Sequence, residues 1–446
     1  MLKSGDRRFI AEADIVVVGS GSAGSCAAIA AARRGVRVLL LERSGFLGGT
    51  STAVLDTFYG FFTPGSFAHK VVGGIGDDVV SRLTRLDAVL ERPNTYGAGM
   101  GITYNPEYLK CAWEQLAQEA GVSVLLYCWV QDVNTSGTEV TSLIVATKSG
   151  LAEVKPRIVI DASGEADICF WAGSPVEIAG EREAAQSLTT TFKMCNVDVP
   201  LRKSIAKDEL HRLMRESADE GYSLPRREGS DHITTISGVM ATNMTRVRSF
   251  ERTGAGLINA TDPQFLTSAE IEGRRQALEY IRFLKERVPG YKNAALAAFS
   301  TQIGIRETRR VVGDYVLTRE DVLGARQFDD QIGLCGAPIE DHDTGDSTHW
   351  AYLPDGECVG IPYRTLIPQQ LSNVFVVGRC FSATHDAHAS VRSMAQCMVM
   401  GQAAGTAAGW CADKNSDTRS VPIQWLREEL ARDGAILETV KEGAEP

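Results

Sequence analysis

Histidine and arginine side chains gather in two short stretches of the sequence, and both residue types can act on a small acidic molecule. The stretch SATHDAHASVR places His385, His388 and Arg392 close together, and GIRETRR supplies Arg306 and Arg309. A histidine can take or give a proton near neutral pH, and an arginine holds carboxylate or enolate oxygens with paired N–H groups. We therefore predict that His385 or His388 transfers a proton and that the three arginines bind an oxyanion. The alternatives are histidines that only hydrogen-bond within the fold and arginines on an ion-paired face.

A third stretch, EDHDTGDSTHW, places His342 and His349 among four acidic residues. We expect a solvated active-site loop here and take His342 as a candidate catalytic residue; a cation-binding loop is the alternative. His385 and His388, with Asp386 between them, also have a spacing that metal ligands adopt. Because the sequence shows no obvious third ligand, we predict no metal site.

Near the start of the chain, three glycines recur with the spacing of a phosphate-binding turn. The β-branched run 15–18 predicts a strand buried on both faces, and the alanine-rich segment 22–34 predicts a helix. Between them, Gly19 permits a tight turn, Gly21 lets backbone approach a pyrophosphate, and Gly24 lets the helix pack close to the sheet. The helix N-terminus then presents free N–H groups and a positive dipole to the phosphates.

An acidic residue follows at the distance that a dinucleotide site needs. Glu42 ends the second predicted strand, 36–41, and lies 18 residues after Gly24. A carboxylate there accepts hydrogen bonds from ribose hydroxyls and repels a 2′-phosphate. Strand, glycine turn, helix and acid together predict a dinucleotide-binding site, and a glycine-rich packing turn is the alternative.

Three features favour FAD over NAD as the dinucleotide. Arg43 and the segment GGTST follow the second strand and can accompany the ribityl and pyrophosphate chain. A later strand ends in DASGEAD, and VFVVGR brings a C-terminal strand back to the same sheet. Wrapping by distant segments suits a flavin, whereas an NAD-binding domain completes its fold locally.

The composition is that of a globular protein with a large core. The 446 residues are 44% hydrophobic and carry a formal net charge of −10, which argues against nucleic acid or an anionic membrane as a partner. No apolar run reaches the ~18 residues of a membrane span, and the charged segment 1–14 lacks the apolar region of a secretory signal. We therefore expect a cytoplasmic protein whose ten scattered cysteines are reduced thiols.

The order of these patterns predicts an α/β fold in two parts. We expect a discontinuous Rossmann-like FAD-binding domain, 1–171 and 361–446, and an inserted mixed α+β substrate or cap domain, 172–360. The nucleotide-type strands occur at both ends of the chain, and a different pattern lies between them. Within the insertion, Thr267 and Glu270 predict a capping box at the start of a long helix.

Six segments spread over most of the chain carry a family likeness: VVVGSGSAGSCAAIAAARRG, LLLERSGFLGGTST, VIDASGEADI, GIRETRRVVGDYVLTREDV, IPYRTLIP and NVFVVGRCFSATHDAHASVRSMAQCMVMGQAAGTAA. In combination they resemble the FAD-dependent oxidoreductase family with the glutathione-reductase-like fold, and more distantly the fumarate reductase and aspartate oxidase flavoproteins. At one position the sequence departs from that pattern, because Arg379 stands where many relatives of the fold carry an acidic residue. The resemblance implies FAD contacts from Gly19, Gly21, Gly24, Glu42, Arg43, Gly49, Thr50, Ser51, Val130, Ala162, Gly164, Gly378 and Arg379. To these predicted contacts we add their sequence neighbours Ser22, Ala23, Gly48 and Ser163, and also Met394.

Small residues recur at every fourth position from Ala389 to Gly409. This ridge predicts a helix that packs closely on another element. The resemblance places the helix N-terminus against the pyrimidine edge of the flavin, where a positive dipole end stabilises the anionic reduced form. A packing helix without an electronic role is the alternative.

From these residues and the resemblance we predict a flavin-dependent dehydrogenase or oxidase that transfers a hydride between a small organic substrate and flavin N5. The alternatives are a flavin-dependent reductase of an activated double bond, a non-catalytic FAD-binding protein and a plain NAD-dependent dehydrogenase. The sequence contains no second Rossmann motif and no cysteine pair to relay electrons. We therefore expect oxygen, a quinone or another carrier to accept the electrons, and we leave the oligomeric state open.

Overall fold

The computed structural model describes residues 8–94, 99–254, 256–342, 345 and 347–439. Most of the charged N-terminal tail and three positions of the EDHDTGDSTHW loop (343, 344 and 346) therefore lie outside the described residues. Within the described ranges, no helix is both long and apolar enough to cross a bilayer.

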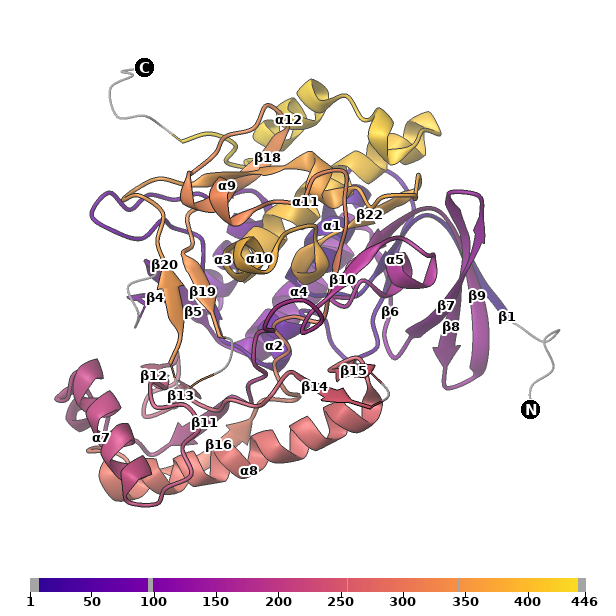
Figure 1. Ribbon diagram of the computed structural model, residues 1–446. Helices are drawn as coiled ribbons and strands as arrows, with labels where there is room; N and C mark the ends of the chain where they lie inside the picture. Colours follow the sequence, from indigo (N-terminus) through magenta and orange to yellow (C-terminus); the bar gives the residue numbers. More distant parts are fainter. Residues whose placement is uncertain (1–7, 95–98, 255, 343–344, 346, 440–446) are drawn as a thin grey trace.

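The central layer is a seven-stranded sheet that combines both ends of the chain (Figure 1). Its strands run in the order β6 (Ser123–Leu125), β2 (Val38–Leu41), β1 (Arg8–Val18), β9 (Gly150–Asp161), β8 (Glu139–Thr147) and β7 (Trp129–Ser136), and β22 (Val374–Val376) also pairs with β9. The strands around β1 are parallel, with Ile15 opposite both Val38 and Ile158. Strands β7 and β8 extend the sheet in antiparallel fashion.

Strand β9 joins the N-terminal and C-terminal segments. Its first half pairs with β8, where Gly150 faces Thr147, and its last residues pair with β22, where Asp161 faces Val376. The run 15–18, expected to be a strand buried on both faces, forms the buried end of β1. The predicted Rossmann-like sheet is thus confirmed, including the return of the C-terminal strand.

Helix α1 (Ser22–Ala32) is buried along its whole length and packs against α11 (Met394–Lys414) (Figure 1). A Cβ atom added at Gly401 would lie 2.1 Å from the carbonyl oxygen of Ala23, and Gly405 shows the same overlap one turn further along α1. Glycine alone lets the two backbones come this close. The packing role predicted for the small-residue ridge is therefore confirmed.

The ridge is shared between two helices rather than one. Helix α10 (His385–Val391) ends before Arg392, and α11 begins at Met394 with Ser393 as its N-cap. The chain therefore turns between the histidine-rich stretch and the glycine-rich stretch.

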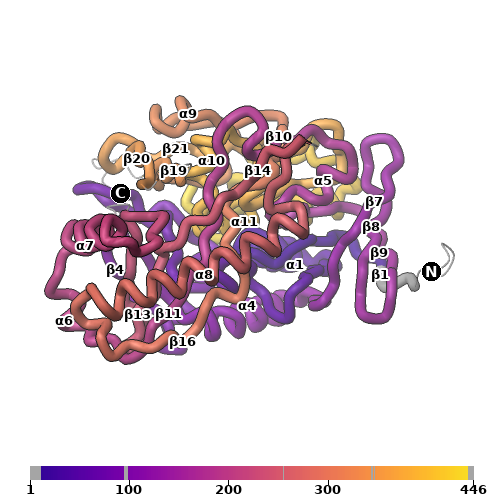
Figure 2. The backbone as a smooth tube through the Cα atoms, turned by 60° about the horizontal axis from the view of Figure 1, so that its bottom comes forward, coloured from indigo at the N-terminus to yellow at the C-terminus, as the bar shows by residue number. Residues whose placement is uncertain are grey.

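Residues between 188 and 305 form hydrophobic cores of their own below the central sheet (Figure 1). An antiparallel sheet in the order β12 (Ser230–Ile233), β13 (Met240–Asn243), β11 (Phe192–Cys195) and β16 (Ala295–Phe299) packs there with helices α7 (Lys207–Asp219) and α8 (Pro263–Arg287). Figure 2 shows α8 lying across the outer side of this part. Phe192, Met214, Tyr280 and Phe283 are among its buried side chains.

Helix α8 begins one turn earlier than the sequence pattern suggested. Asp262 is its N-cap, and Oδ1 of Asp262 accepts hydrogen bonds from the backbone N–H groups of Gln264 and Phe265. Pro263 occupies the first helical position, which suits proline. The hydroxyl of Thr267 instead donates to the carbonyl of Pro263 inside the first turn. The predicted capping box at 267–270 is therefore wrong, because an Asp-Pro pair supplies the start.

The core around α1 and α11 also takes in part of the segment that we assigned to the insertion. Leu334, Val359 and Ile361 belong to the same hydrophobic cluster as α1.

The remaining α-helices and strands are α2 (Thr50–Ala53), β3 (Thr57–Phe58), α3 (Ile75–Arg85), β4 (Val89–Pro93), β5 (Met100–Tyr104), α4 (Pro106–Ala120), α5 (Asp167–Trp171), β10 (Val176–Ile178), α6 (Val199–Lys203), β14 (Phe250–Thr253), β15 (Gly256–Asn259), β17 (Arg309–Val311), α9 (Arg319–Leu323), β18 (Gln331–Cys335), β19 (Ile339–Asp341), β20 (His349–Ala351), β21 (Val359–Pro362) and α12 (Ile423–Arg432).

Candidate active site

A cavity of about 290 Å³ lies beyond the carboxyl ends of β1, β2, β9 and β22. One end is lined by the turns that follow these strands, and the other by polar residues from 189–306 and 340–342. Ligands of open α/β sheets bind at this edge. The predicted site residues that line it are Gly19, Gly21, Ser22, Ala23, Glu42, Arg43, Gly49, Thr50, Val130, Ala162, Ser163, Gly164, Gly378, Arg379, Met394, Arg306, Arg392 and His342.

The glycine turn leaves room for a phosphate in front of α1. A Cβ atom at Gly24 would lie 1.9 Å from the carbonyl oxygen of Gly19, and one at Gly19 would lie 2.4 Å from that of Ala162. A Cβ atom at Gly21 would meet nothing within 4 Å, because it would point into open space. No described side chain caps α1, and the buried hydroxyl of Ser22 has no partner among the described residues. These groups fit a bound pyrophosphate, which needs N–H and O–H donors at a helix N-terminus.

Glu42 is held rigidly at the end of β2. Its carboxylate accepts hydrogen bonds from the backbone N–H of Ser20 at 2.9 Å and of Ser44 at 2.7 Å. Next to it, the guanidinium carbon of Arg43 lies 5.8 Å from the centre of the Trp129 ring, and both residues line the cavity. The ribose and adenine part of a dinucleotide would meet an acid, a cation and an aromatic ring at this end.

The segment after β2 closes against the glycine turn. Gly48 forms a β-bridge with Gly21, and a Cβ atom at Gly49 would lie 2.9 Å from the Cα of Gly21. The hydroxyl of Ser51 donates to the carbonyl of Gly48 at 2.7 Å. Gly24, Gly48 and Ser51 stand outside the lining, so they shape the turn from behind.

Arg379, at the position where an acid is common, has an acid beside it. Its Nη2 lies 2.6 Å from Oε1 of Glu165, and its Nη1 donates to the carbonyl of Ile305. Glu165 belongs to the DASGEAD turn after β9. Glu165 thus supplies a carboxylate beside Arg379 from the turn after another strand, and that carboxylate offsets the charge of Arg379 without itself lining the cavity.

Charged side chains dominate the opposite end of the cavity. Arg226, Arg306, Arg392 and Glu340 all line it. Arg306 donates through Nη1 to the Ser187 carbonyl at 2.7 Å. Burial, together with the nearby Arg392 and Arg226, lowers the pKa of the Arg306 guanidinium. An anion bound here would relieve this repulsion between like charges.

Arg392 has no hydrogen-bond or ion-pair partner for its guanidinium anywhere in the described structure. Its Nε is fully buried, and the residue sits at the turn between α10 and α11. Burial also lowers the pKa of Arg392, although Glu340 opposes this effect. An unpaired guanidinium in a cavity is suited to a carboxylate or another oxyanion of a ligand.

Glu340 and His342 form a pair beside these arginines. Nε2 of His342 lies 2.9 Å from Oε1 of Glu340, and Nδ1 of His342 lies 3.1 Å from the Thr348 hydroxyl. Burial and the charge of Arg306 lower the pKa of His342 to about 3, so the imidazole is neutral near pH 7. Burial alone would raise the pKa of Glu340, but His342 and the nearby Arg392 and Arg306 outweigh it and lower the pKa to about 2. Glu340 is therefore ionised.

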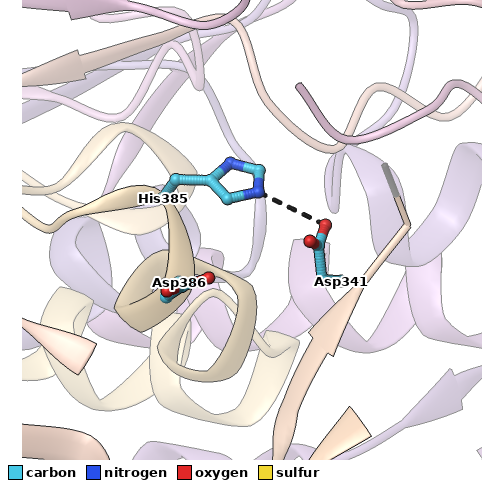
Figure 3. Close-up of side chains that lie close together, drawn as sticks. All are labelled: Asp341, His385 and Asp386. Carbon is cyan, nitrogen blue, oxygen red and sulfur yellow. Dashed lines mark hydrogen bonds and ion pairs between the residues drawn. The ribbon is translucent and has the colours of Figure 1, made fainter. Parts of the chain in front are cut away.

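His385 stands outside the cavity lining, within a hydrogen-bonded cluster (Figure 3). Its Nδ1 lies 2.9 Å from Oε2 of Glu307, and its Nε2 points toward Asp341 at 3.3 Å. Asp386 follows on α10, and the possible ligand atoms of Asp341, His385 and Asp386 lie within 4.8 Å of one another. Each already has a protein partner, since Gln186 donates to Asp341 and Arg319 to Asp386.

His388 also stands outside the lining and supports the turn after β22. Its Nε2 lies 2.7 Å from the carbonyl oxygen of Arg379, and its ring stacks near Phe381. Burial, followed by the charge of Arg392, holds the pKa of His388 well below its usual value. His388 is therefore neutral, and it holds the backbone at Arg379 rather than facing the cavity.

Arg309 does not line the cavity either. It forms an ion pair with Asp167 at 2.9 Å and lies 4.1 Å from the ring centre of Phe170. Burial, with the neighbouring charges of Asp161 and Glu165, raises the pKa of Asp167 to about 6 despite this ion pair. Of the three predicted oxyanion-binding arginines, Arg306 and Arg392 are thus brought together in the cavity.

Glu340 and Arg226 line the cavity although the sequence did not predict them as site residues. Glu340 lies in the EDHDTGDSTHW stretch, next to the predicted candidate His342. Arg226 lies in an unremarkable stretch, LPRREG, and the side chain enters the cavity wall because the carbonyl of Asn243 and the Tyr280 hydroxyl hold this segment. No local motif marks such a residue, because its position depends on tertiary contacts.

The sheet, the glycine turn and the acid after β2 define a Rossmann-like, dinucleotide-binding flavoprotein fold. The chain matches the model of the family described as FAD dependent oxidoreductase over residues 14–430, and it belongs to that family. It is therefore an enzyme with FAD as its cofactor, and the predictions of family, fold class and cofactor are confirmed. A comparison with curated proteins finds no match.

Solved structures share the fold at low sequence identity. The chain is similar to p-nitrophenol 4-monooxygenase PnpA from Pseudomonas putida DLL-E4, with 11% identity and a TM-score of 0.50 over 96% of this chain and 88% of that one. It is also similar to the flavin-dependent brominase Bmp2, with 14% identity and a TM-score of 0.49 over 94% and 84% of the two chains. The likeness to PnpA concerns the fold alone.

Proposed function

We propose that this enzyme exchanges a hydride between its flavin and a small organic acid, most simply as a dehydrogenase or oxidase that removes hydrogen from a C–OH group. The observation that carries this proposal is the unpaired guanidinium of Arg392, which lines the same cavity as the glycine turn. A cavity with a nucleotide-binding end and a cationic end can hold a cofactor and an anionic substrate next to each other.

The cofactor would be held by the turns that follow the parallel strands. The α1 N-terminus would bind the pyrophosphate, Glu42 the ribose, and the turns at 162–164 and 378–379 would complete the wrapping. When bound there, FAD supplies a hydride acceptor or donor at its N5 atom. Gly24, Gly48 and Ser51 would act indirectly by holding the turn in shape.

Arg392 and Arg306 would bind and orient the substrate oxyanion. Both guanidinium groups have nitrogen atoms without a described partner, and both belong to well-packed segments. Arginine pairs with a carboxylate through two parallel hydrogen bonds, which fixes orientation as well as position. Orientation of the reacting C–H bond is a large part of what an enzyme supplies to a hydride transfer.

Glu340 is the residue that we propose as proton acceptor, in place of His385 and His388. Its Oε1 is held by His342, and Oε2 has no hydrogen-bond partner in the described part of the chain. In the free enzyme, His342 and the neighbouring Arg392 and Arg306 lower the pKa of Glu340 and so keep it a weak base. A bound oxyanion offsets those positive charges, so the pKa of Glu340 rises when the substrate is present and the carboxylate becomes a better base.

Anaerobic mixing of the oxidised holoenzyme with a panel of hydroxy acids, alcohols, amines and amino acids tests the proposal. We expect a hydroxy acid to bleach the visible flavin absorbance, and Arg392→Met and Glu340→Gln to slow the bleaching while retaining FAD. Arg364→Met is the matched control, because this exposed arginine pairs with Asp330 outside the cavity lining.

Two outcomes would contradict the proposal. Bleaching by neutral alcohols alone, unaffected by Arg392→Met, would remove the oxyanion from the mechanism. The second outcome is that no member of the panel reduces the flavin, but an unsaturated acid reoxidises flavin that has first been reduced chemically. That result would favour a reductase of an activated double bond.

A further inference from the structure

The charged end of the cavity carries more positive charge than one carboxylate would offset. Among the described residues that line it, Arg226, Arg306 and Arg392 each contribute one positive charge and Glu340 one negative charge. His342 is neutral near pH 7, since its pKa is lowered to about 3 by burial and by Arg306. The balance is two positive charges within a partly buried space, and a ligand with two negative charges matches it.

The arginines differ in how much of their hydrogen-bonding capacity is used. Arg226 is buried and donates to the carbonyl of Asn243 at 3.1 Å, so it contributes mainly charge. Arg306 uses Nη1 on Ser187 and Thr189. The other nitrogens of Arg306 and the terminal nitrogens of Arg392 are the donors that a ligand can take.

Glu340 adds a requirement of the opposite kind. Among the described residues that line this end of the cavity it is the one carboxylate, and its side chain is 36% exposed, so Oε2 is open to a ligand. An ionised carboxylate accepts hydrogen bonds but cannot donate them. A ligand that carried only carboxylates would place an anion against Glu340, so a hydroxyl or ammonium group must face this residue.

The other residues at this end are mixed in polarity. Thr189, Thr191, Ser230, Asn243 and Gln302 line the cavity together with Val54, Leu55 and Tyr59. The same cavity of about 290 Å³ also has to hold the flavin, so the space left beside the charged residues suits a short ligand.

We propose that the substrate is a short aliphatic dicarboxylate that bears a hydroxyl group on the reacting carbon. This inference rests on the proposed function and specifies its substrate class. The two carboxylates lie against Arg392 and Arg306, with Arg226 adding to the positive field, and the hydroxyl donates its hydrogen bond to Glu340. Glu340 would take the hydroxyl proton as the C–OH carbon becomes a carbonyl, and FAD, when bound at the nucleotide end of the cavity, would supply the acceptor for the carbinol hydrogen as hydride.

Binding to the oxidised holoenzyme tests the recognition separately from turnover. Malate, succinate, lactate and aspartate are titrated against the enzyme, and the shift of the visible flavin spectrum gives each dissociation constant. Malate has both carboxylates and the hydroxyl, succinate lacks the hydroxyl, lactate lacks one carboxylate, and aspartate replaces the hydroxyl with an ammonium. We expect the dissociation constant of malate to be lower than that of each of the other three acids by about tenfold or more.

Two variants connect the preference to particular residues. Glu340→Gln should leave succinate binding about unchanged or tighter and should lose the preference for malate over succinate, because an amide no longer demands a donor. Arg392→Met should weaken the binding of malate by about tenfold or more. Arg364→Met should match the unaltered enzyme, and the FAD content and thermal midpoint of each variant show whether it is folded.

The result that overturns the inference is equal binding of malate and succinate, or of malate and lactate, in the unaltered enzyme. Tighter binding of aspartate than of malate would overturn it as well, since Glu340 would then select a cation. If malate binds as expected but never bleaches the flavin, the proposed function fails while the recognition stands. If another hydroxy acid bleaches the flavin and malate does not bind, the recognition fails while the proposed function stands.

Discussion

At the scale of single residues, the glycine turn separates two requirements that sequence motifs merge. Gly24 is needed for packing, because a Cβ atom there would lie 1.9 Å from the Gly19 carbonyl oxygen. Gly21 is not needed for packing, because its Cβ atom would meet nothing within 4 Å. Its φ of −56° is also open to any residue. The empty space in front of Gly21 therefore points to a ligand rather than to the fold.

We expect Gly21→Ala to weaken FAD binding about tenfold or more while the apoprotein stays as stable or gains about 0.4–1 kcal/mol. The added methyl group takes the space through which a pyrophosphate would approach the α1 N-terminus. Fluorescence titration with FAD and urea unfolding of the apoprotein measure the two effects. Gly24→Ala is the matched control and should instead lose about 1–3 kcal/mol of stability. Unchanged FAD affinity in Gly21→Ala would place the pyrophosphate elsewhere.

His388 is the second residue whose role the structure makes testable. Its hydrogen bond to the Arg379 carbonyl and its full burial indicate a positioning role. We expect His388→Ala to lower the free energy of unfolding by about 2–4 kcal/mol, and to leave the shape of the pH profile of substrate-dependent flavin bleaching unchanged. His388→Gln should recover part of the stability, because an amide can also donate to that carbonyl. A limb of the profile that disappears in His388→Ala would show that the imidazole titrates during catalysis.

At the scale of elements, the contact between α1 and α11 links the cofactor turn to the C-terminal end of the chain. Both helices are largely buried, and the glycines of α11 lie directly against backbone carbonyls of α1. Overpacking this contact would push α1 away from α11 and so move the turn at its N-terminus. The geometry of the phosphate site therefore depends on residues almost 400 positions away in the sequence.

We expect Gly405→Ala to destabilise the protein by about 1–3 kcal/mol and to weaken FAD binding at the same time. The reason is that the new Cβ atom would lie 2.2 Å from the Ala27 carbonyl oxygen. Thermal unfolding with and without FAD measures both effects. Gly254→Ala is the control, because a Cβ atom at this exposed glycine would meet nothing within 4 Å. If Gly405→Ala and Gly254→Ala behave alike, α1 and α11 are not packed as tightly as described.

Elements whose end signals lie in neighbouring residues could be predicted from the sequence. Elements for which the sequence offers two alternative ends could not. Helix α4 is an element of the first kind: Asn105 caps it, Pro106 opens it and Gly121 ends it in the left-handed region, and each of these signals depends only on neighbouring residues. The start of α8 was misplaced because two acceptable caps lie five residues apart, and Asp262 with Pro263 is the stronger. The break between α10 and α11 was missed because the small residues continue their spacing through Arg392.

At the scale of the whole molecule, the nucleotide end of the site could be predicted and the substrate end only in part. The glycines and Glu42 follow consecutive strands of one parallel sheet, so their order in the sequence fixes their order in space. Arg306, Glu340 and Arg392 come from three segments that no regular pattern connects, and Arg226 from a fourth. The sequence spacing did not distinguish Arg306 from Arg309. In the structure Arg309 pairs with Asp167, whereas Arg306 lines the cavity.

The stability of the folded protein should depend on pH through Asp167, which lines the cavity. Burial, with Asp161 and Glu165 nearby, raises the pKa of Asp167 to about 6, above its value of 3.8 when unperturbed. The folded state therefore binds the proton more tightly than the unfolded state. The resulting stabilisation is fully present below a pH of about 4, and it is lost as the pH rises through about 6.

We expect Asp167→Asn to remove this increment, because an amide does not titrate. The free energy of unfolding of the variant, minus that of the unaltered enzyme, should be larger at about pH 7 than at about pH 5. The expected increase in this difference is about 1–3 kcal/mol. Urea unfolding of both proteins at the two pH values measures it, and the exposed Glu107→Gln variant controls for the loss of a surface charge. A difference that is the same at both pH values would mean that Asp167 is already ionised throughout this range, and that Arg309 outweighs burial and the neighbouring carboxylates at this edge of the cavity.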